Sequence, residues 1–360
     1  MNTRAKDVRA DYGALVTGTA SEELAAQRQV LERGDDYDSL FMGRVPEAVA
    51  AAEFGCGNPT RHLRAGDTVL DIGCGAGMNC YIAAQAVGAT GRVIGADFTP
   101  AMLEIARGNR EAFAAQVPDA APMDYVLASA NDLTLDLEWA NGWLADNPVR
   151  STAEMDAYMN AVAEARRTRP AVADASVDIV ISNCVINLLD DTAKVDVFKE
   201  MFRVLKPGGR FAISDNVSNR PVPEELKADT VLWSACYAGV LQEQAFYDAL
   251  EAAGFVNIRV EMRNPEPAKV VDDLLFYAVT VVGEKAEAPA FRGALPKVLY
   301  RGPNKAIIGD SGKVYRRGRV EPLAPQDRHM ADDAEGFGLF VLDESEVTIE
   351  AQQVAQACCD

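Results

Sequence analysis

The feature that most constrains the fold is a glycine-rich turn between a buried strand and a helix. Residues 68–72 read TVLDI, an apolar run of strand length, and residues 78–88 read MNCYIAAQAVG, which has the pattern of a helix. Between them lies GCGAG, residues 73–77. In a parallel α/β sheet such a turn presents backbone N–H groups and a helix N-terminus to a ligand. The segment therefore predicts a doubly wound α/β sheet with a ligand site at the end of this strand.

The remaining chain continues the alternation of strands and helices. Short apolar runs flanked by amphipathic helices indicate a parallel sheet buried on both faces, and an antiparallel edge pair is a common addition. The predicted strands are 68–72, 92–97, 123–129, 177–183, 210–215, 255–262 and 274–284. We therefore predict a seven-stranded, Rossmann-like sheet, with Pro100 and residues 193–205 marking two of its helices.

Three further segments frame this sheet. Residues 1–66 have mostly helical patterns, in the runs 21–34 and 46–55, and are predicted to form an N-terminal helical cap. The sheet domain then spans 67–285 and carries a helical insertion at 134–174, which is too long for a bare connection. Residues 285–290 are a predicted linker, 286–360 a small C-terminal β-rich domain, and 348–360 a helix or loose tail.

Composition excludes several classes of protein. The chain has 360 residues, 49% hydrophobic and 25% charged, which excludes a disordered or collagen-like protein. A formal charge of −19 repels nucleic acid and anionic lipid, and no apolar run approaches the length of a membrane span. Seven cysteines without a spaced loop framework favour thiols rather than disulfides, so we expect a cytoplasmic protein with no nucleic-acid or membrane partner.

Two carboxylates near the glycine turn indicate which kind of ligand the turn binds. Asp97 ends the second strand, twenty residues after Gly77, where a carboxylate can accept both hydroxyls of a ribose. Asp71 immediately precedes the glycine turn. A pyrophosphate disfavours a neighbouring carboxylate, whereas the ammonium of a methionine group is attracted by one. The alternative, in which the glycines only make a tight turn and Asp97 caps the next helix, does not explain this spacing.

These residues resemble the class I S-adenosylmethionine-dependent methyltransferases over residues 66–285. The resemblance implies that the glycine loop holds the methionine portion, the acid after strand two the ribose, and the end of strand three the adenine. It also implies that Asn183 borders the sulfonium. The implied cofactor-binding residues are Asp71, Gly73, Gly75, Gly77, Asp97, Phe98, Ala130, Asn131 and Asn183. Many members have Asp at the position of Ser129, a departure at the adenine contact.

The cysteines are the second group of candidate functional residues. Cys74 and Cys80 lie in or after the glycine loop, and we interpret them as small buried hydrophobic residues. Taken singly, Cys56, Cys184 and Cys236 could also be core residues. However, Cys184 follows strand four at the edge where open sheets bind ligands, and Cys56 precedes the cofactor strand. We therefore expect these three thiols to converge near the methyl donor.

Three thiolates favour a soft ion. Methyl transfer to oxygen or nitrogen usually needs a general base, but His62 and His329 are the only histidines of the chain and neither stands in a recognisable motif. Three sulfur ligands suit trivalent arsenic, whose lone pair remains available to accept a methyl group. Zinc is the competing ion, but its structural sites usually have a fourth ligand and closer cysteine spacing.

The motifs closely resemble those of the arsenite methyltransferases, over nearly the whole chain. They are GCGNP at 55–59, SNCVINL at 182–188, VLWSAC at 231–236, VRADYG at 8–13, DFTPAML at 97–103 and YRGP at 300–303. The resemblance implies successive methylation of As(III), which is bound by Cys56, Cys184 and Cys236. It also implies that S-adenosylmethionine is the methyl donor and that glutathione or thioredoxin is the reductant. The implied role is arsenic detoxification.

Some features depart from that family or leave alternatives open. Residues 1–55 contain no cysteine to form a disulfide relay with Cys56, and the insertion at 134–174 is unusually long. Cys358 and Cys359 resemble a vicinal thiol pair at the tail of some members. The alternatives are a methyltransferase for another soft nucleophile, such as a thiol, selenium, tellurium or organoarsenical compound, and a non-catalytic protein that sequesters As(III). Asp97 argues against the second alternative.

Overall fold

The computed structural model describes residues 3–22, 37–52, 54–286 and 296–342. The chain divides into two compact units, residues 1–285 and 286–360. Most of the predicted helix at 21–34, the predicted linker, and the tail with Cys358 and Cys359 lie outside the described residues. Among the helices that are described, none is both long and apolar enough to cross a membrane.

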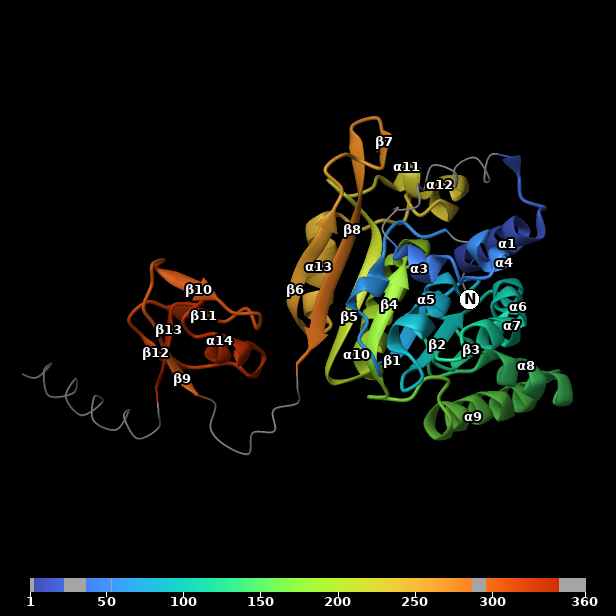
Figure 1. The fold of residues 1–360 in the computed structure, drawn as a ribbon, viewed down its shortest axis with the longest axis horizontal. Helices are drawn as coiled ribbons and strands as arrows, with labels where there is room; N and C mark the ends of the chain where they lie inside the picture. Colours follow the sequence, from blue (N-terminus) through green and yellow to red (C-terminus); the bar gives the residue numbers. More distant parts are fainter. Residues whose placement is uncertain (1–2, 23–36, 53, 287–295, 343–360) are drawn as a thin grey trace, which may run out of the picture. The chain divides into compact units, whose positions relative to one another are not determined.

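The first unit is built on one large twisted sheet (Figure 1). Its strands follow the order β3-β2-β1-β4-β5-β8-β6, and β7 pairs with β8. The first five strands are parallel, while β8 is antiparallel to both β5 and β6. Their bounds are β1 Thr68–Ile72, β2 Arg92–Asp97, β3 Met123–Leu127, β4 Val177–Asn183, β5 Leu205–Ser218, β6 Phe255–Arg263, β7 Lys269–Val271 and β8 Leu274–Lys285. The doubly wound α/β class is confirmed, and the short β7 adds an eighth strand to the seven predicted.

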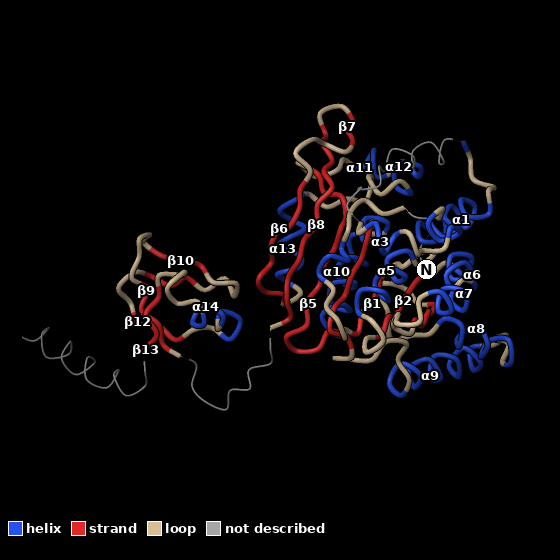
Figure 2. Tube along the Cα trace, viewed as in Figure 1, coloured by secondary structure: helices blue, strands red, loops and turns tan. Residues whose placement is uncertain are grey.

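Helices cover both faces of this sheet (Figure 2). One core cluster joins α5, α6 and α7 to one face, and a second joins α10 and α13 to the other. This explains why the central strands are apolar on both sides. These helices are α5 Met78–Val87, α6 Pro100–Gly108, α7 Arg110–Gln116, α10 Asp191–Val204 and α13 Glu243–Ala252. Because the strand order reverses between β1 and β4, a crevice opens at their carboxyl ends, the usual ligand site of such sheets.

Several short elements complete this unit. They are α1 Thr3–Thr17, α3 Ser39–Met42, α4 Glu47–Ala50, the 3₁₀ turns η1 Pro59–His62 and η2 Ile186–Leu188, α11 Glu224–Lys227 and α12 Thr230–Ser234. The helix expected over 46–55 is therefore only one turn, α4. Gly55 and Cys56 instead follow as irregular chain, which leaves Cys56 outside any helix.

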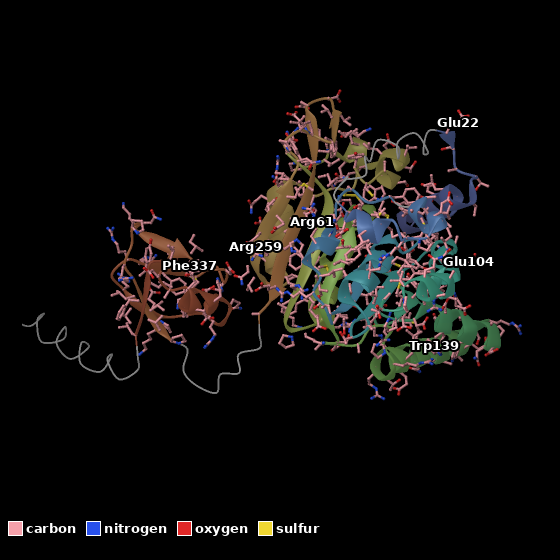
Figure 3. The ribbon with its side chains drawn as sticks, in the orientation of Figure 1. Glu22, Arg61, Glu104, Trp139, Arg259 and Phe337 are labelled. Atoms are coloured by element: carbon pink, nitrogen blue, oxygen red, sulfur yellow. A yellow bond between two sulfur atoms is a disulfide. The ribbon has the colours of Figure 1, made fainter. Side chains whose placement is uncertain are left out.

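The long connection between β3 and β4 contains two helices, α8 Leu137–Asp146 and α9 Thr152–Thr168. Asp136 and Ser151 cap their N-termini by accepting hydrogen bonds from backbone N–H groups. Trp139 of α8, labelled in Figure 3, lies under the guanidinium group of Arg169, whose carbon is 4.1 Å from the ring centroid. This contact fastens the end of α9 to α8.

The second unit has its own small core. Its strands are β9 Lys297–Tyr300, β10 Ala306–Ile308, β11 Val314–Arg316, β12 Val320–Pro322 and β13 Leu339–Leu342, with η3 Pro325–Asp327 and α14 His329–Asp332. They form a three-stranded sheet, β12-β9-β13, and a two-stranded one, β10-β11. The buried carboxylate of Asp327 accepts hydrogen bonds from Ser311 and from the Tyr315 hydroxyl, which joins β11 to η3.

Candidate functional site

A cavity of about 370 Å³ lies at the carboxyl ends of β1 to β4. This volume is within the usual range for a small-molecule site. Seven of the nine predicted cofactor-binding residues line it: Gly73, Gly75, Asp97, Phe98, Ala130, Asn131 and Asn183. The other two, Asp71 and Gly77, are absent from its described lining. The cavity is therefore built by residues that are far apart in sequence and that share one sheet edge.

The glycine loop is held by backbone hydrogen bonds to β2. The N–H groups of Gly73 and Cys74 both donate to the carbonyl oxygen of Ala96, at 2.8 and 3.1 Å. Gly73 has a φ of +69°, and a Cβ there would overlap the methyl groups of Val185. Gly77, with a φ of +95°, would overlap the Tyr125 hydroxyl. Glycine is thus needed at these two positions for backbone conformation and for close approach.

Asp97 is fixed at the end of β2 by two backbone donors. Its Oδ1 accepts from the N–H of Thr99 at 2.7 Å and its Oδ2 from the N–H of Gly75 at 3.0 Å. Burial raises the pKa of this carboxyl, against the lowering effect of these hydrogen bonds. Each carboxylate oxygen retains a second lone pair for a ligand hydroxyl. Asp97 therefore combines a fixed orientation with a place on the cavity wall.

Asp71 lies below the cavity, in the interior. Its Oδ2 accepts a hydrogen bond from the thiol of Cys80 at 3.3 Å. Burial raises the pKa of Cys74 to about 11 and that of Cys80 well above its usual value. Both thiols thus stay protonated near neutral pH and are poor nucleophiles. This placement suits their interpretation as buried structural residues.

The far end of the cavity is tied to the insertion. Asp132, which lines the cavity, accepts a hydrogen bond from Arg166 of α9 at 2.5 Å. The Ser129 hydroxyl donates to Asn131 at 2.5 Å, and Leu137 of α8 also lines the cavity. The helices α8 and α9 therefore support the wall formed by residues 129–132.

The three predicted cysteines form one cluster. Cys56, Cys184 and Cys236 are all buried and pack together with Leu188. Cys184 lines the cavity, whereas Cys56 and Cys236 lie beside it, outside its described lining. The Cys236 thiol donates to the carbonyl oxygen of Cys184 at 3.2 Å. The structure thus brings together residues that are 52 to 180 positions apart in the chain.

Cys56 and Cys184 are joined by a disulfide, with their Cα atoms 6.0 Å apart. The expectation that the cysteines are thiols rather than disulfides is therefore wrong for this pair, whereas Cys74, Cys80 and Cys236 remain thiols in the described part of the chain. The reason is geometric, because the Cα separation lies in the range that a disulfide requires. A separation of 128 residues gave no local signal of this pairing.

Both Cys184 and Cys236 have left-handed backbones, with φ angles of +56° and +63°. This region costs a residue other than glycine or asparagine roughly 1 kcal/mol or more. Such strain is concentrated at functional sites in proteins. The backbone therefore singles out these two cysteines independently of their sequence motifs.

Asn183 holds the segment that carries Cys56. Its side-chain oxygen accepts from the N–H groups of Cys56 and Gly57 at 2.9 and 3.3 Å. Its amide nitrogen donates to the carbonyl oxygen of Gly57 at 2.7 Å. Asn183 was expected to border the sulfonium of the cofactor, and it does line the cavity. Its side chain, however, is engaged mainly in fastening the Cys56 segment to β4.

Asp215 is a site residue that the sequence analysis missed. It lies on β5, is fully buried, and places a carboxylate oxygen within 4.8 Å of the sulfur atoms of both Cys56 and Cys184. Its oxygens accept hydrogen bonds from the N–H of Ile186 at 2.9 Å and from the side chain of Asn187 at 2.6 Å. Burial raises its pKa to about 6. The one sequence signal was its position at the predicted end of a strand, 210–215.

The N-terminal helix α1 contacts both the cavity and the cysteine cluster. Val8, Arg9 and Tyr12 line the cavity, and the Tyr12 hydroxyl lies 3.7 Å from the sulfur of Cys236. Asp11 accepts a hydrogen bond from Ser234 of α12 at 2.6 Å. The edge of the Tyr12 ring packs on Phe54, with the ring centroids 5.9 Å apart. This helix therefore closes the site.

Sequence comparisons place the chain among methyltransferases. A family model described as a methyltransferase domain matches residues 63–124 and 150–254. An arsenite methyltransferase of Aquipseudomonas alcaligenes is 29% identical over 325 residues, covering 83% of each chain. That of Halobacterium salinarum is 32% identical, covering 80% of this chain and 64% of the relative. The human arsenite methyltransferase is 28% identical, over 88% of this chain and 77% of its own.

Comparison with solved structures supports the fold. The crystal structure of an arsenic(III) S-adenosylmethionine methyltransferase from Chlamydomonas reinhardtii aligns with a TM-score of 0.51 and 24% identity. The alignment covers 89% of this chain and 96% of that protein. The similarity therefore extends beyond the central sheet, over most of both chains.

Proposed function

Because the chain belongs to the arsenite methyltransferase family, we propose that it transfers methyl groups from S-adenosylmethionine to trivalent arsenic held by Cys56, Cys184 and Cys236. The observation that carries this proposal is the packing of these three cysteines in one buried cluster, of which Cys184 lines the cavity that Asp97 and the glycine loop also line. Soft sulfur ligands and a ribose-binding carboxylate meet at one sheet edge.

The cavity fits the methyl donor in size and chemistry. Its volume of about 370 Å³ suits a nucleoside-sized ligand, and Asp97 offers lone pairs to ribose hydroxyls. When bound, S-adenosylmethionine supplies an electrophilic methyl group on a sulfonium. We assign Gly73, Gly75 and Asp97 to its binding, with Phe98, Ala130 and Asn131 on the adenine side. Asp71 acts from below the loop, through its negative charge.

The cysteines bind arsenic only as thiolates, so the disulfide between Cys56 and Cys184 must first be reduced. Two electrons and two protons from a cellular dithiol, or from two molecules of glutathione, convert it to two thiols, and the reductant becomes a disulfide. Arsenous acid then forms three As–S bonds and releases three water molecules. This need for a reductant is consistent with a site of action in the cytoplasm.

The bound arsenic carries its own nucleophile. Three thiolates would occupy three positions of a pyramidal As(III), and its lone pair would form the As–CH₃ bond while the S–CH₃ bond of the sulfonium breaks and S-adenosylhomocysteine leaves. No general base is needed for this step, and neither histidine lies in the cavity's described lining. The chain contributes orientation, by fixing Cys184 on the cavity wall with a left-handed backbone.

The test is an incubation of purified protein with arsenite, S-adenosylmethionine and a thiol reductant, followed by separation and counting of the arsenic species. We expect methylated arsenic from the wild type and a loss of at least a hundredfold in Cys184→Ser. Cys80→Ser is the matched control, since it makes the same exchange at a buried cysteine outside the cavity lining and keeps a donor for Asp71, and it should retain the wild-type rate within about twofold.

Binding measurements on the same protein preparation distinguish arsenite methylation from the two alternatives, another soft nucleophile and sequestration of As(III). If S-adenosylmethionine binds tightly and arsenite yields no methylated product, the substrate assignment is wrong and another soft nucleophile must be sought. If arsenite binds and the cofactor does not, the protein sequesters As(III) without turnover. Equal rates for the Cys184→Ser and wild-type proteins would refute the assignment of Cys184 as an arsenic ligand.

A further inference from the structure

Arg9 is the one cationic side chain among the described residues that line the cavity. The acidic residues of that lining are Asp97, which faces backbone donors, and Asp132, which pairs with Arg166. Among the described residues Arg9 makes no ion pair. A guanidinium group in this position lacks a counter-charge, and a carboxylate of the ligand would supply one. The methionine portion of the methyl donor carries such a carboxylate.

The position of Arg9 in α1 connects it to the arsenic ligands. Tyr12 lies three residues later and therefore on the same face of the helix. Its hydroxyl is 3.7 Å from the sulfur of Cys236, within hydrogen-bond distance for a thiol. One face of a single helix thus contacts both the cofactor cavity and one of the proposed arsenic ligands.

A second contact joins α1 to the same segment. Asp11 accepts a hydrogen bond from the hydroxyl of Ser234 at 2.6 Å, and Ser234 ends the helix that precedes Cys236. Val8 packs in one cluster with Leu232 and Trp233 of that helix. Any shift of α1 toward the cavity is therefore transmitted to α12 and to Cys236.

The segment around Cys236 is sensitive to such a shift. Cys236 has a φ of +63°, so its backbone is held in a costly conformation by its surroundings. Its thiol donates to the carbonyl oxygen of Cys184, and the indole N–H of Trp233 donates to that of Leu188. These bonds connect α12 to the loop after β4, which carries the second arsenic ligand.

We propose that α1 couples the two ligands: the cofactor's carboxylate binds Arg9 and seats this helix, and the seated helix positions Cys236 through Tyr12 and Asp11. This inference rests on the proposed function and deepens it, because it assigns α1 as the element through which methyl donor and arsenite bind with positive cooperativity. Tyr12 and Asp11 are positioning residues, since they act through Cys236 and α12.

The coupling must be reciprocal. If the bound cofactor raises the affinity for arsenite by some factor, arsenite raises the affinity for the cofactor by the same factor. Couplings of this kind in proteins typically amount to factors of 5 to 150. We expect at least a fivefold effect here, because two hydrogen bonds and one packed cluster join α1 to the Cys236 segment.

The experiment is calorimetric titration of the fully reduced, full-length protein with S-adenosylhomocysteine, in the absence and presence of saturating arsenite. The converse titration, arsenite with and without S-adenosylhomocysteine, closes the cycle. This homologue retains the carboxylate and cannot donate a methyl group, so no turnover interferes. We expect the dissociation constant of each ligand to fall at least fivefold when the other ligand is bound.

Three variants locate the coupling. Arg9→Gln should raise the dissociation constant of S-adenosylhomocysteine about tenfold, the loss of one charge-assisted hydrogen bond. Lys6→Gln removes the same charge from an exposed position of the same helix and should leave that constant unchanged. Tyr12→Phe keeps the ring on the cavity wall and removes only the hydroxyl that lies near Cys236, so the coupling factor should fall toward one.

The outcomes are distinct. Independent binding of both ligands by the wild type, or full coupling in Tyr12→Phe, would overturn the inference and leave the proposed function intact. Equal effects of Arg9→Gln and Lys6→Gln would overturn the role of Arg9. Failure of the wild type to bind either ligand would count against the proposed function itself. Rescue of affinity by Arg9→Lys, which retains the charge, would support an ion pair over a packing role.

Discussion

Asp215 and Cys184 come from neighbouring strands, β5 and the end of β4, and the carboxylate of the first lies within 4.8 Å of the sulfur of the second. The same carboxylate accepts the N–H of Ile186, two residues beyond the cysteine. Asp215 therefore holds the loop that carries Cys184 from below. Because the N–H of Cys184 also donates to the carbonyl oxygen of Ser214, β5 supports this loop at two points.

The first prediction concerns pH. Burial raises the pKa of Asp215 to about 6 in the folded state, above its ordinary value of 3.8. The folded protein therefore binds this proton more tightly than the unfolded chain does, and the contribution of Asp215 to stability grows as the pH falls through 6 toward 4. Between pH 7.5 and pH 5 this gain is about 1 kcal/mol. Urea unfolding of wild type and Asp215→Asn at both pH values measures it.

Asn cannot ionise, so Asp215→Asn lacks this pH-dependent contribution to the free energy of unfolding. The stability difference between the wild type and Asp215→Asn should shift by about 1 kcal/mol in favour of the wild type at the lower pH. A difference that stays constant with pH would contradict the raised pKa. Asp124→Asn, at an exposed position on β3, serves as the control for the general effect of removing a carboxylate.

The second prediction concerns the disulfide. The test uses Cys358→Ser/Cys359→Ser protein, which lacks the vicinal thiols of the tail. Oxidised, this protein should bind no arsenite, because two of the three proposed ligands are bonded to each other. After reduction and removal of the reductant, we expect one arsenic per chain, measured by elemental analysis after gel filtration. Binding of S-adenosylhomocysteine should persist in the oxidised protein, since Asp97 and the glycine loop are separate from the disulfide. Arsenite binding by the oxidised form would exclude Cys56 and Cys184 as its ligands.

The third prediction compares two glycines of the loop. Gly73→Ala adds a Cβ that overlaps Val185 and also strains a φ of +69°, so it should lower the free energy of unfolding by about 3 kcal/mol. Gly75 has a φ of +54°, and the Cβ added in Gly75→Ala meets open space. The free energy of unfolding should therefore fall by only about 1 kcal/mol. Urea unfolding of both variants distinguishes the two causes.

Val185→Ala provides the check on Gly73→Ala. In the double variant the two overlapping methyl groups are removed, while a close contact with the Cβ of residue 185 and the backbone strain remain, so part of the lost stability should return. If Gly73→Ala and Gly75→Ala are equally destabilised, the close approach of the loop to Val185 contributes little. That contact matters because Val185 directly follows Cys184 in the chain.

The fourth prediction concerns Asp97. Asp97→Asn removes the charge and turns an amide toward two backbone donors, the N–H groups of Gly75 and Thr99. We expect the dissociation constant of S-adenosylhomocysteine to rise about 10- to 100-fold, as for the loss of hydrogen bonds to a charged group. Arsenite binding in the absence of cofactor should be unchanged. A change of less than twofold in cofactor affinity would show that another residue holds the ribose.

The residues that were predictable from sequence share one property: their relation to the site is local. Gly73, Gly75 and Asp97 lie at strand ends. The strand pattern, together with the spacing between the glycine loop and Asp97, placed all three on one edge of the sheet. The β7 strand was missed because Lys269–Val271 is three residues long, too short for a periodic signal. The extent of α4 was overestimated because an alanine-rich run favours helix, while the chain after Ala50 turns toward the sheet.

The remaining features depend on distant contacts. Asp215 reaches the cysteines only because β4 and β5 are neighbours, and Asn183 fastens Cys56 across more than a hundred residues. The left-handed backbones of Cys184 and Cys236 follow from tertiary packing, and no propensity indicates cysteine for them. Family motifs in the sequence identified which cysteines cluster, but not how the backbone holds them or which two are joined.

The left-handed conformation of Cys184 and Cys236 has a consequence for variation at these positions. Glycine adopts this backbone without a steric penalty, so replacing either cysteine by glycine would relieve about 1 kcal/mol of strain at that residue. The residues that favour folding and the residues that bind a soft ion are therefore different here. The backbone conformation and the binding of a soft ion thus favour different residues at these two positions, and a glycine introduced at either one would remove a proposed ligand.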